Sequence, residues 1–312
     1  MEYEPETQRR VAGDLTHLLR DQLIAPKKRS FEENLALVRA RGKTVTPRAV
    51  PAGQRALPHW PEEVRGVPNA ALRGALFTVS KERAMHKQLT AVAALSGIAI
   101  RVQNARLNQQ DLDLFEMLLH LQREQPLGEK VEFTAHAMLK ALGRPMGGSA
   151  HERLANDLAR LMGSIVEIKW IKERKTFLGA LVERAFRDDV TGRYVVRLNS
   201  DTMKLYGQGH TWIDSQQRQA LGQNNLAKWL HGFYASHAQP FPYKVKTLRG
   251  LCGTTIGRLV DFRRVLRLAL GRLKEVGSIN NWDIDVRTDL VTVVKMPTQT
   301  QRKYLAKIKS MK

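Results

Sequence analysis

Cysteine is almost absent from this sequence: Cys252 is the only one in 312 residues. A single cysteine excludes an internal disulfide and any zinc finger that depends on cysteine pairs. Long apolar runs are also missing, since no stretch approaches the roughly 20 residues that a membrane-spanning helix needs. The first ten residues, MEYEPETQRR, lack the apolar core of a signal peptide. We therefore expect a cytoplasmic protein that does not have a membrane as its partner.

The sequence signatures of several enzyme classes are missing as well. Nucleotide hydrolysis needs a G-x-x-x-x-G-K-[ST] loop, and the glycine-rich segment 143–148 lacks its lysine. No His-x-His pair is present to hold the metal of a nicking endonuclease, and His151-Glu152 lacks the second histidine of a zinc protease. The three aspartates between 283 and 289 fall in a predicted strand–turn–strand, where we expect them to face water. The sequence thus predicts neither an enzyme nor a cofactor or metal.

Positive charge dominates what is present. Lysine and arginine number 51 against 30 aspartates and glutamates, which gives a formal net charge of +21. Such an excess attracts a polyanion: nucleic acid first, a membrane surface or an acidic protein second. Hydrophobic residues make up 43%, enough for real cores, whereas aromatics are only 6%, too few for the stacking platform of an RNA-binding protein. Duplex DNA is the expected partner.

The chain divides by composition into four parts. Residues 1–60 form an arm: the pattern allows helices at 7–24 and 30–40, but prolines between 47 and 58 prevent a regular element there. We expect this arm to be partly disordered. The length then suits two domains, at 61–200 and 201–296, followed by a basic C-terminal tail at 297–312.

The first domain shows helix, turn, helix and β-ribbon in that order, which is the order of a winged-helix domain. The expected elements are strands at 75–79 and 98–102, a helix at 109–124, a strand at 131–133, a helix at 135–142 capped by Thr134, a helix at 150–163 capped by Ser149, and strands at 164–172, 176–187 and 193–198. The basic loop 172–175 joins two of these strands.

The second domain repeats that order loosely. The expected elements are helices at 215–237 and 245–251, a long helix at 256–276 capped by Thr254 or Thr255 and ended by Gly277, and a β-ribbon at 278–295. Two similar orders in one chain indicate a pseudo-repeat. The predicted fold class is α+β, with two winged-helix domains in tandem behind a partly disordered N-terminal arm.

Helix 150–163 is the candidate recognition helix of the first domain. Leucines occupy one of its faces and polar side chains another. Arginine matches the edge of guanine and asparagine the edge of adenine in the major groove. A solvated polar face is the alternative, and the turn before the helix and the basic loop after it favour recognition. The basic loop could contact phosphates or be ordinary surface. The candidate DNA-binding residues of this domain are Ser149, Arg153, Asn156, Arg160, Lys169, Lys172, Arg174 and Lys175.

Helix 256–276 is a stronger candidate for DNA binding than helix 150–163. Its apolar residues form one face, and its basic residues form an opposite arc that contains no carboxylate. A surface helix usually mixes charges, because like charges one turn apart repel. An unmixed basic arc therefore indicates an anionic partner, with a solvated basic face as the alternative. The candidate DNA-binding residues of this domain are Thr254, Thr255, Arg258, Arg263, Arg264, Arg267 and Lys274.

Several short segments resemble the TrfA family of plasmid replication initiators. They are Trp60-Pro61, Pro68-Asn69, 75–78, 126–129, Phe133-Thr134, Leu142-Gly143 and 158–161, and then the closest stretch, at 234–237, 240–243, 246–249 and 251–253. They occur in the same order from about residue 60 to 282. Their order and spacing, rather than any one of them, carry the resemblance.

The resemblance implies a fold of two winged-helix domains that bind direct repeats, called iterons, in a replication origin. It further implies melting of adjacent AT-rich DNA, with single-stranded origin DNA as a second nucleic-acid target. The host partners it implies are the initiator ATPase, the replicative helicase and the sliding clamp. It also implies that the monomer binds DNA, whereas the dimer is inactive or inhibitory.

One departure from the family weakens part of this expectation. The family's clamp-binding motif, of the form Q-L-S-L-F, stands before its Trp-Pro, and residues 54–58 here read Gln-Arg-Ala-Leu-Pro without the aromatic end. The leading prediction is an iteron-binding replication initiator that performs no covalent chemistry. The alternative is a winged-helix transcriptional repressor that uses the same domains.

Overall fold

The computed structural model describes residues 57–126 and 128–310. The predicted arm lies outside the described residues except for its last four. Buried side chains form two cores, one drawn from residues 57–213 and the other from 221–293. The predicted domain boundary at 200/201 falls inside the first core, because Leu205, Tyr206 and Ile213 are buried there.

The first core contains a group of three helices and three strands that we term the first unit. It consists of α4 (Gln109–Gln122), β4 (Lys130–Thr134), α5 (Ala135–Ala141), α6 (Gly148–Gly163), β7 (Val182–Asp188) and β8 (Arg193–Leu198). Its antiparallel sheet has the order β4-β8-β7. Thr134 caps α5, as predicted, by accepting a hydrogen bond from the Ala137 N–H. Asn108 caps α4 in a capping box with Asp111.

The chain between α6 and β7 enters a second sheet, which it shares with two strands that precede α4, and we term this the inserted sheet. It joins β2 (Met85–Val92), β3 (Ile98–Ala105), β5 (Ile165–Trp170) and β6 (Lys175–Gly179) in the order β2-β3-β5-β6. The predicted strand 176–187 is therefore wrong as a single strand: its halves, β6 and β7, belong to different sheets. The predicted strand 75–79 is also wrong, since this segment makes only one isolated bridge, between Thr78 and Asn108.

The second core surrounds a set of elements that we term the second unit. It consists of α9 (Asn225–Ala235), β10 (Tyr243–Lys244), α10 (Val245–Leu251), α11 (Leu259–Glu275), β11 (Asn281–Ile284) and β12 (Leu290–Val294). Its sheet order, β10-β12-β11, matches that of the first unit. The predicted helix 215–237 is broken into α8 (Ser215–Ala220) and α9, because Gly222 adopts a φ of +58° and Asn224 caps a new helix.

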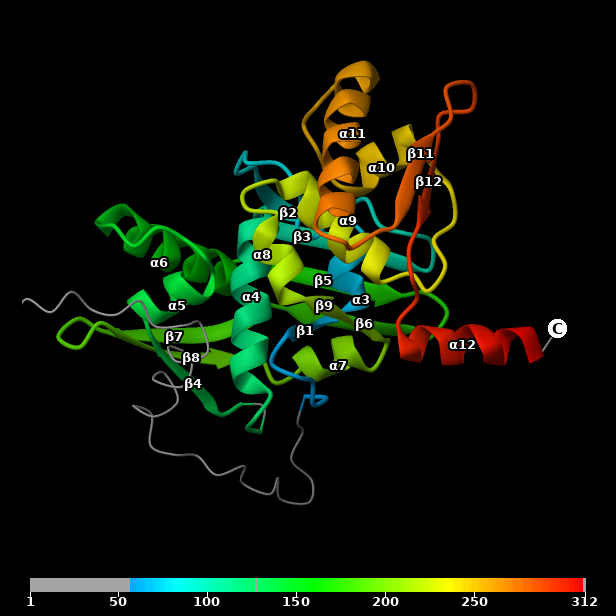
Figure 1. Cartoon of the computed structure of the whole chain (residues 1–312). Coiled ribbons are helices and arrows are strands. Elements are labelled where there is room, and N and C mark those ends of the chain that lie inside the picture. Colours follow the sequence, from blue (N-terminus) through cyan, green and yellow to red (C-terminus); the bar gives the residue numbers. More distant parts are fainter. Residues whose placement is uncertain (1–56, 127, 311–312) are drawn as a thin grey trace, which may run out of the picture.

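Helix α4 runs through the middle of the molecule (Figure 1), and the elements not yet named lie outside the two units and the inserted sheet. They are β1 (Val64–Pro68), α3 (Asn69–Leu72), α7 (Thr202–Tyr206), β9 (His210–Asp214) and α12 (Gln299–Ser310). Strands β1 and β9 pair with each other. The predicted basic tail is thus helical over 299–310, and it points away from the body. Within the described ranges, no helix combines the length and apolar character needed to cross a bilayer.

Candidate nucleic-acid interface

Helix α6 presents a short polar face at its first two turns. Leu154, Leu158 and Leu161 are buried, as the periodicity predicts, while Arg153 and Asn156 are exposed. The helix starts at Gly148 without any side-chain cap, so the expected cap by Ser149 is wrong. The Ser149 hydroxyl instead accepts a hydrogen bond of 2.7 Å from Nη2 of Arg153. This places a hydroxyl, a guanidinium and an amide together at the start of α6.

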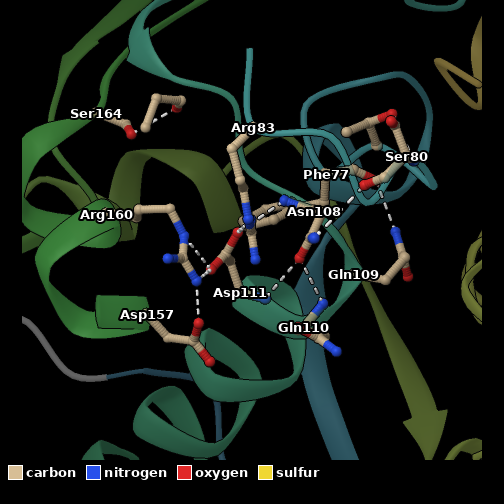
Figure 2. Close-up of polar contacts among 12 residues, drawn as sticks. Phe77, Ser80, Arg83, Asn108, Gln109, Gln110, Asp111, Asp157, Arg160 and Ser164 are labelled. Carbon is tan, nitrogen blue, oxygen red and sulfur yellow. Dashed lines mark hydrogen bonds and ion pairs between the residues drawn. The ribbon is translucent and has the colours of Figure 1, made fainter. Parts of the chain in front are cut away.

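Arg160 does not belong to that exposed face. Its Nε and Nη2 donate to Oδ1 of Asp111 on α4 at 3.0 and 2.8 Å, and it also pairs with Asp157 (Figure 2). Arg160 lies nearly two turns beyond Arg153 at almost the same angle around the helix axis, but there the start of α4 covers the helix. Its charge is therefore neutralised within the protein, which corrects the prediction that it shares a free face with Arg153.

Asp111 is the centre of this network. Its carboxylate is completely buried and also accepts hydrogen bonds of 2.8 Å from Nη1 of Arg83 and from the backbone N–H of Asn108 (Figure 2). A buried carboxylate needs such partners, because an uncompensated charge in the interior is strongly unfavourable. Through Asp111, Arg160 thus fixes α6 on the start of α4, and Arg83 ties the segment before β2 to the same point.

The hairpin that completes the first unit is β7–β8, and its tip lies at the same end of the molecule as α6 (Figure 1). Oδ1 of Asp188 accepts hydrogen bonds from the backbone N–H groups of Val190 and Thr191, at 2.9 and 3.1 Å. These bonds, that of Thr191 first, hold the pKa of Asp188 below its usual value. Val190 is 96% exposed at the tip. Basic residues line the two strands: Arg184, Arg187, Arg193 and Arg197.

The basic loop predicted to follow α6 as its ribbon occupies a different place. Lys169, Lys172, Arg174 and Lys175 are exposed around the β5–β6 turn of the inserted sheet, not in the sheet of the first unit. Strand β5 carries the chain about 20 Å from the end of α6, at roughly 3.3 Å per residue. The predicted ribbon after α6 therefore belongs to the inserted sheet, and the hairpin of the first unit is β7–β8, whose turn at 189–192 the sequence predicts.

Helix α11 matches its predicted amphipathic pattern closely. Its core residues Phe262, Leu266, Ala269, Leu270 and Leu273 are completely buried. On the opposite side Arg264, Arg267 and Lys274 are exposed, and among the described residues neither arginine forms an ion pair. Two exposed apolar side chains, Val260 and Leu268, interrupt this basic face.

Arg263 differs from its neighbours on α11. Its Nε and Nη2 donate to the two carboxylate oxygens of Asp289 at 2.8 and 2.9 Å. This two-pronged bond raises the pKa of Arg263 and ties α11 to the end of the β11–β12 turn. The prediction that Arg263 lies on a free basic arc is therefore wrong, because a carboxylate from outside the helix neutralises it.

The residues before α11 are placed at the entrance to the helix. Arg258 is the N-cap residue and has no capping side chain, so the predicted caps by Thr254 or Thr255 are wrong. The Thr254 hydroxyl accepts a hydrogen bond from the Ile256 N–H instead. Thr255 and Arg258 are exposed, and Nε of Arg258 lies 3.6 Å from Oδ2 of Asp261.

The tip of the β11–β12 hairpin repeats that of β7–β8 in detail. Oδ1 of Asp285 accepts from the N–H groups of Arg287 and Thr288, at 3.0 and 2.7 Å, as Asp188 does in the first hairpin. These bonds, that of Thr288 first, lower the pKa of Asp285. Val286 is 90% exposed, which gives each tip one projecting valine. The two units are therefore alike in element order, sheet order and turn geometry.

Comparison with known protein families identifies the family of this chain. A family model described as TrfA protein matches residues 50–295. The chain belongs to the TrfA family. The prediction drawn from the short segments between 60 and 282 is thereby confirmed. No group of three or more His, Cys, Asp or Glu side chains is placed to hold a metal ion in residues 57–126 and 128–310 of this TrfA-family chain.

Individual relatives are more distant. The chain is 24% identical over 241 residues to the plasmid replication initiator protein TrfA of Escherichia coli, which covers 74% of this chain and 62% of that relative. The TrfA-family chain thus spans less than two thirds of the relative's length. Two crystal structures of domains 2 and 3 of RctB are similar at TM-scores of 0.48 and 0.47, with 14% and 13% identity. They cover 66% and 73% of this chain, and 86% and 97% of theirs.

Proposed function

We propose that the two units are winged-helix units, and that this chain is a plasmid replication initiator that binds iterons in duplex origin DNA. One observation carries the proposal. Twice in the same chain, a helix with an exposed basic or polar face is followed by a β-hairpin, and the two hairpins have the same aspartate-capped turn. Membership of the TrfA family supports it. Two recognition elements in one chain suit a long, asymmetric site read by a monomer.

In this proposal the exposed stripe of α11 reads bases. Among the described residues Arg264 and Arg267 form no ion pair, and arginine can donate two hydrogen bonds to one guanine. Lys274 lies further along the same stripe. The helix entrance, with Thr254, Thr255 and Arg258, contacts the phosphates beside the groove.

The start of α6 reads the other part of the site through Arg153 and Asn156, with Ser149 beside them. Arg160 and Arg263 position their helices and do not touch DNA. The arginines of β7–β8 contact the backbone next to α6. The lysines of the β5–β6 turn, including Lys175, contribute general attraction to a polyanion rather than sequence selection.

The wider functions belong to the same proposal and are supported by the family resemblance. They are opening of adjacent AT-rich DNA with single-stranded origin DNA as a target, recruitment of the host initiator ATPase and the replicative helicase, a balance between monomer and dimer, a cytoplasmic location and the lack of covalent chemistry. Contact with the sliding clamp has the weakest support, because segment 54–58 lacks the aromatic end of the motif.

Footprinting on the plasmid that encodes the chain tests the proposal. We expect protection of several tandem repeats beside an AT-rich segment, at about nanomolar protein, the common range for specific sites. A single protected operator would favour the repressor. Equal affinity for the repeats and for scrambled duplexes at physiological salt would contradict both functions.

A further inference from the structure

The two units are joined through a buried segment of the first core. Thr78 lies between them and is completely buried. On one side its backbone N–H donates to the Leu107 carbonyl at 3.0 Å, and its own carbonyl accepts from the Gln109 N–H at 3.2 Å. On the other side its hydroxyl donates to the Gly253 carbonyl at 2.5 Å. A single residue thus contacts the start of α4 and the end of α10.

Gly253 fits this contact because it has no side chain. Its φ is +64°, in the left-handed region that favours glycine. A Cβ atom there would lie 2.5 Å from Nη2 of Arg106, 2.8 Å from Oγ1 of Thr78 and 3.0 Å from Cβ of Ala75. Nη2 of Arg106 also donates to the Gly253 carbonyl at 3.1 Å. Gly253 precedes the N-cap residue of α11 by five positions, so this contact anchors the entrance to that helix.

Backbone pairing reinforces the same contact. The Val79 N–H donates to the Cys252 carbonyl at 3.0 Å, and the Val79 carbonyl accepts from Nδ2 of Asn225 at 3.1 Å. These bonds join the first core to α9 and α10 of the second unit. Units separated by a flexible linker make no such bonds, and their relative motion is the usual expectation.

The contact continues to α6 without a break. The start of α4 beside Thr78 is capped by Asn108, whose backbone N–H donates to Asp111 (Figure 2). Asp111 in turn binds Arg160 of α6. Helix α6 and the entrance to α11 are therefore connected by hydrogen-bonded groups in which the intermediate residues are buried.

We propose that this chain of contacts, which we term the strut and which runs from Arg160 through Asp111, Asn108 and Thr78 to Gly253, fixes the orientation of α6 relative to α11. The strut makes the protein a reader of one site whose two parts have a fixed spacing. Thr78 and Gly253 are positioning residues in it. This consequence for DNA rests on the proposed function, whereas the fixed orientation itself does not.

The helical geometry of DNA predicts how a fixed orientation of α6 and α11 limits the spacing of the site. One inserted base pair moves one part of a site by about 3.4 Å and rotates it by roughly 35° about the duplex axis, at 10–10.5 base pairs per turn. Two rigidly joined helices cannot both follow that rotation. Two loosely joined helices can.

The first test needs no DNA. Spin labels are placed on the full chain at Glu152→Cys of α6 and Glu275→Cys of α11, both exposed positions. The native Cys252 is buried and its thiol pKa is raised to about 12 by that burial, so it stays unlabelled. We expect one narrow distance distribution, and a broad one after Thr78→Val or Gly253→Ala. A distribution that stays narrow in both variants would overturn the strut.

The second test measures affinity for the natural site and for sites with one or two base pairs inserted between its parts. We expect an insertion to weaken binding about tenfold or more in the native chain, the size of a typical mismatch effect. The penalty should fall to about threefold or less in Thr78→Val, and Thr78→Ser should restore it because the hydroxyl returns.

A matched control separates loss of the strut from loss of stability. Thr134→Ala removes the cap of α5 and so lowers stability without touching the second unit. It should keep both the narrow distribution and the insertion penalty. Failure of any specific DNA binding would refute the proposed function while leaving the spin-label test decisive. If Thr78→Val binds the natural site normally and loses as much affinity on base-pair insertion as the native chain, the strut alone would be refuted.

Discussion

Asp289 in the second hairpin occupies the position that Gly192 occupies in the first. Both follow the threonine of their turn and adopt left-handed backbone, with φ of +58° and +65°. Only Asp289 also reaches back to its helix, where it binds Arg263 with both carboxylate oxygens. The second hairpin is therefore tied to its helix by a contact that glycine cannot make in the first.

This difference predicts losses of stability of different size for two substitutions of Asp289. Asp289→Gly loses the partly exposed ion pair but gains a residue suited to positive φ, so we expect a loss of less than about 1 kcal/mol. Asp289→Ala loses the pair and keeps the strained backbone, and we expect about 1–2 kcal/mol. Urea denaturation gives both values. An equal loss in the two variants would show that the backbone conformation contributes nothing.

The second prediction separates base reading from general attraction. Arg267→Ala should cost about 1–3 kcal/mol on the proper site and relax the preference at one base position. Lys175→Ala, in the inserted sheet, should weaken proper and scrambled sites alike and flatten the salt dependence by about one phosphate contact. Binding to a panel of base-substituted sites at several salt concentrations measures both. A uniform loss across the panel for Arg267→Ala would assign that arginine to phosphate.

The third prediction concerns the two arginines of α6. Arg160→Ala removes one partner of the buried Asp111 carboxylate, so we expect unfolding to become easier by about 3 kcal/mol. Arg153→Ala, on the exposed first turn, should change stability by less than about 0.5 kcal/mol while it weakens specific DNA binding. Thermal unfolding and DNA titration of both variants decide the matter. Similar stability losses in the two would contradict the different environments found for them.

The fourth prediction concerns pH. Burial raises the pKa of Glu116 from 4.5 to about 7, although Arg218 lies 3.0 Å away. Between those values the folded protein holds a proton that the unfolded chain has released, so this group's contribution to stability falls as pH rises from about 4.5 to about 7. Relative to the native chain, Glu116→Gln should therefore gain stability across that window and hold the gain above it.

The quantity to measure for Glu116 is the difference in free energy of unfolding between Glu116→Gln and the native chain at each pH. The pH dependence of the native chain alone does not isolate this group. Burial lowers the pKa of His120 to about 4, of His237 to about 4 and of His231 to about 3. Histidines of this kind contribute stability that grows as pH rises toward 6.5, which opposes the effect of Glu116. A constant difference between Glu116→Gln and the native chain from pH 4 to pH 8 would mean that Glu116 does not titrate in this range.

Local signals in the sequence determined much of this fold. The periodicity of α11 predicts its completely buried core face, the threonine before α5 predicts a cap that is present, and Gly277 ends α11 with a φ of +74°. Helix α10 and the ribbon 278–295 also lie where the pattern places them. Each of these features depends on residues within a few positions of one another, which is why a single sequence suffices to predict them.

The tertiary structure alone decided which arginines are free. Arg160 is neutralised by Asp111, 49 positions away, and Arg263 by Asp289, 26 positions away. It also decided that β6 and β7, consecutive in sequence, enter different sheets, so that the lysine-rich loop leaves the first unit and an arginine-lined hairpin takes its place. Helical periodicity specifies the angle at which a side chain leaves its own helix, but the partner that meets it comes from a distant segment, and only folding brings the two together.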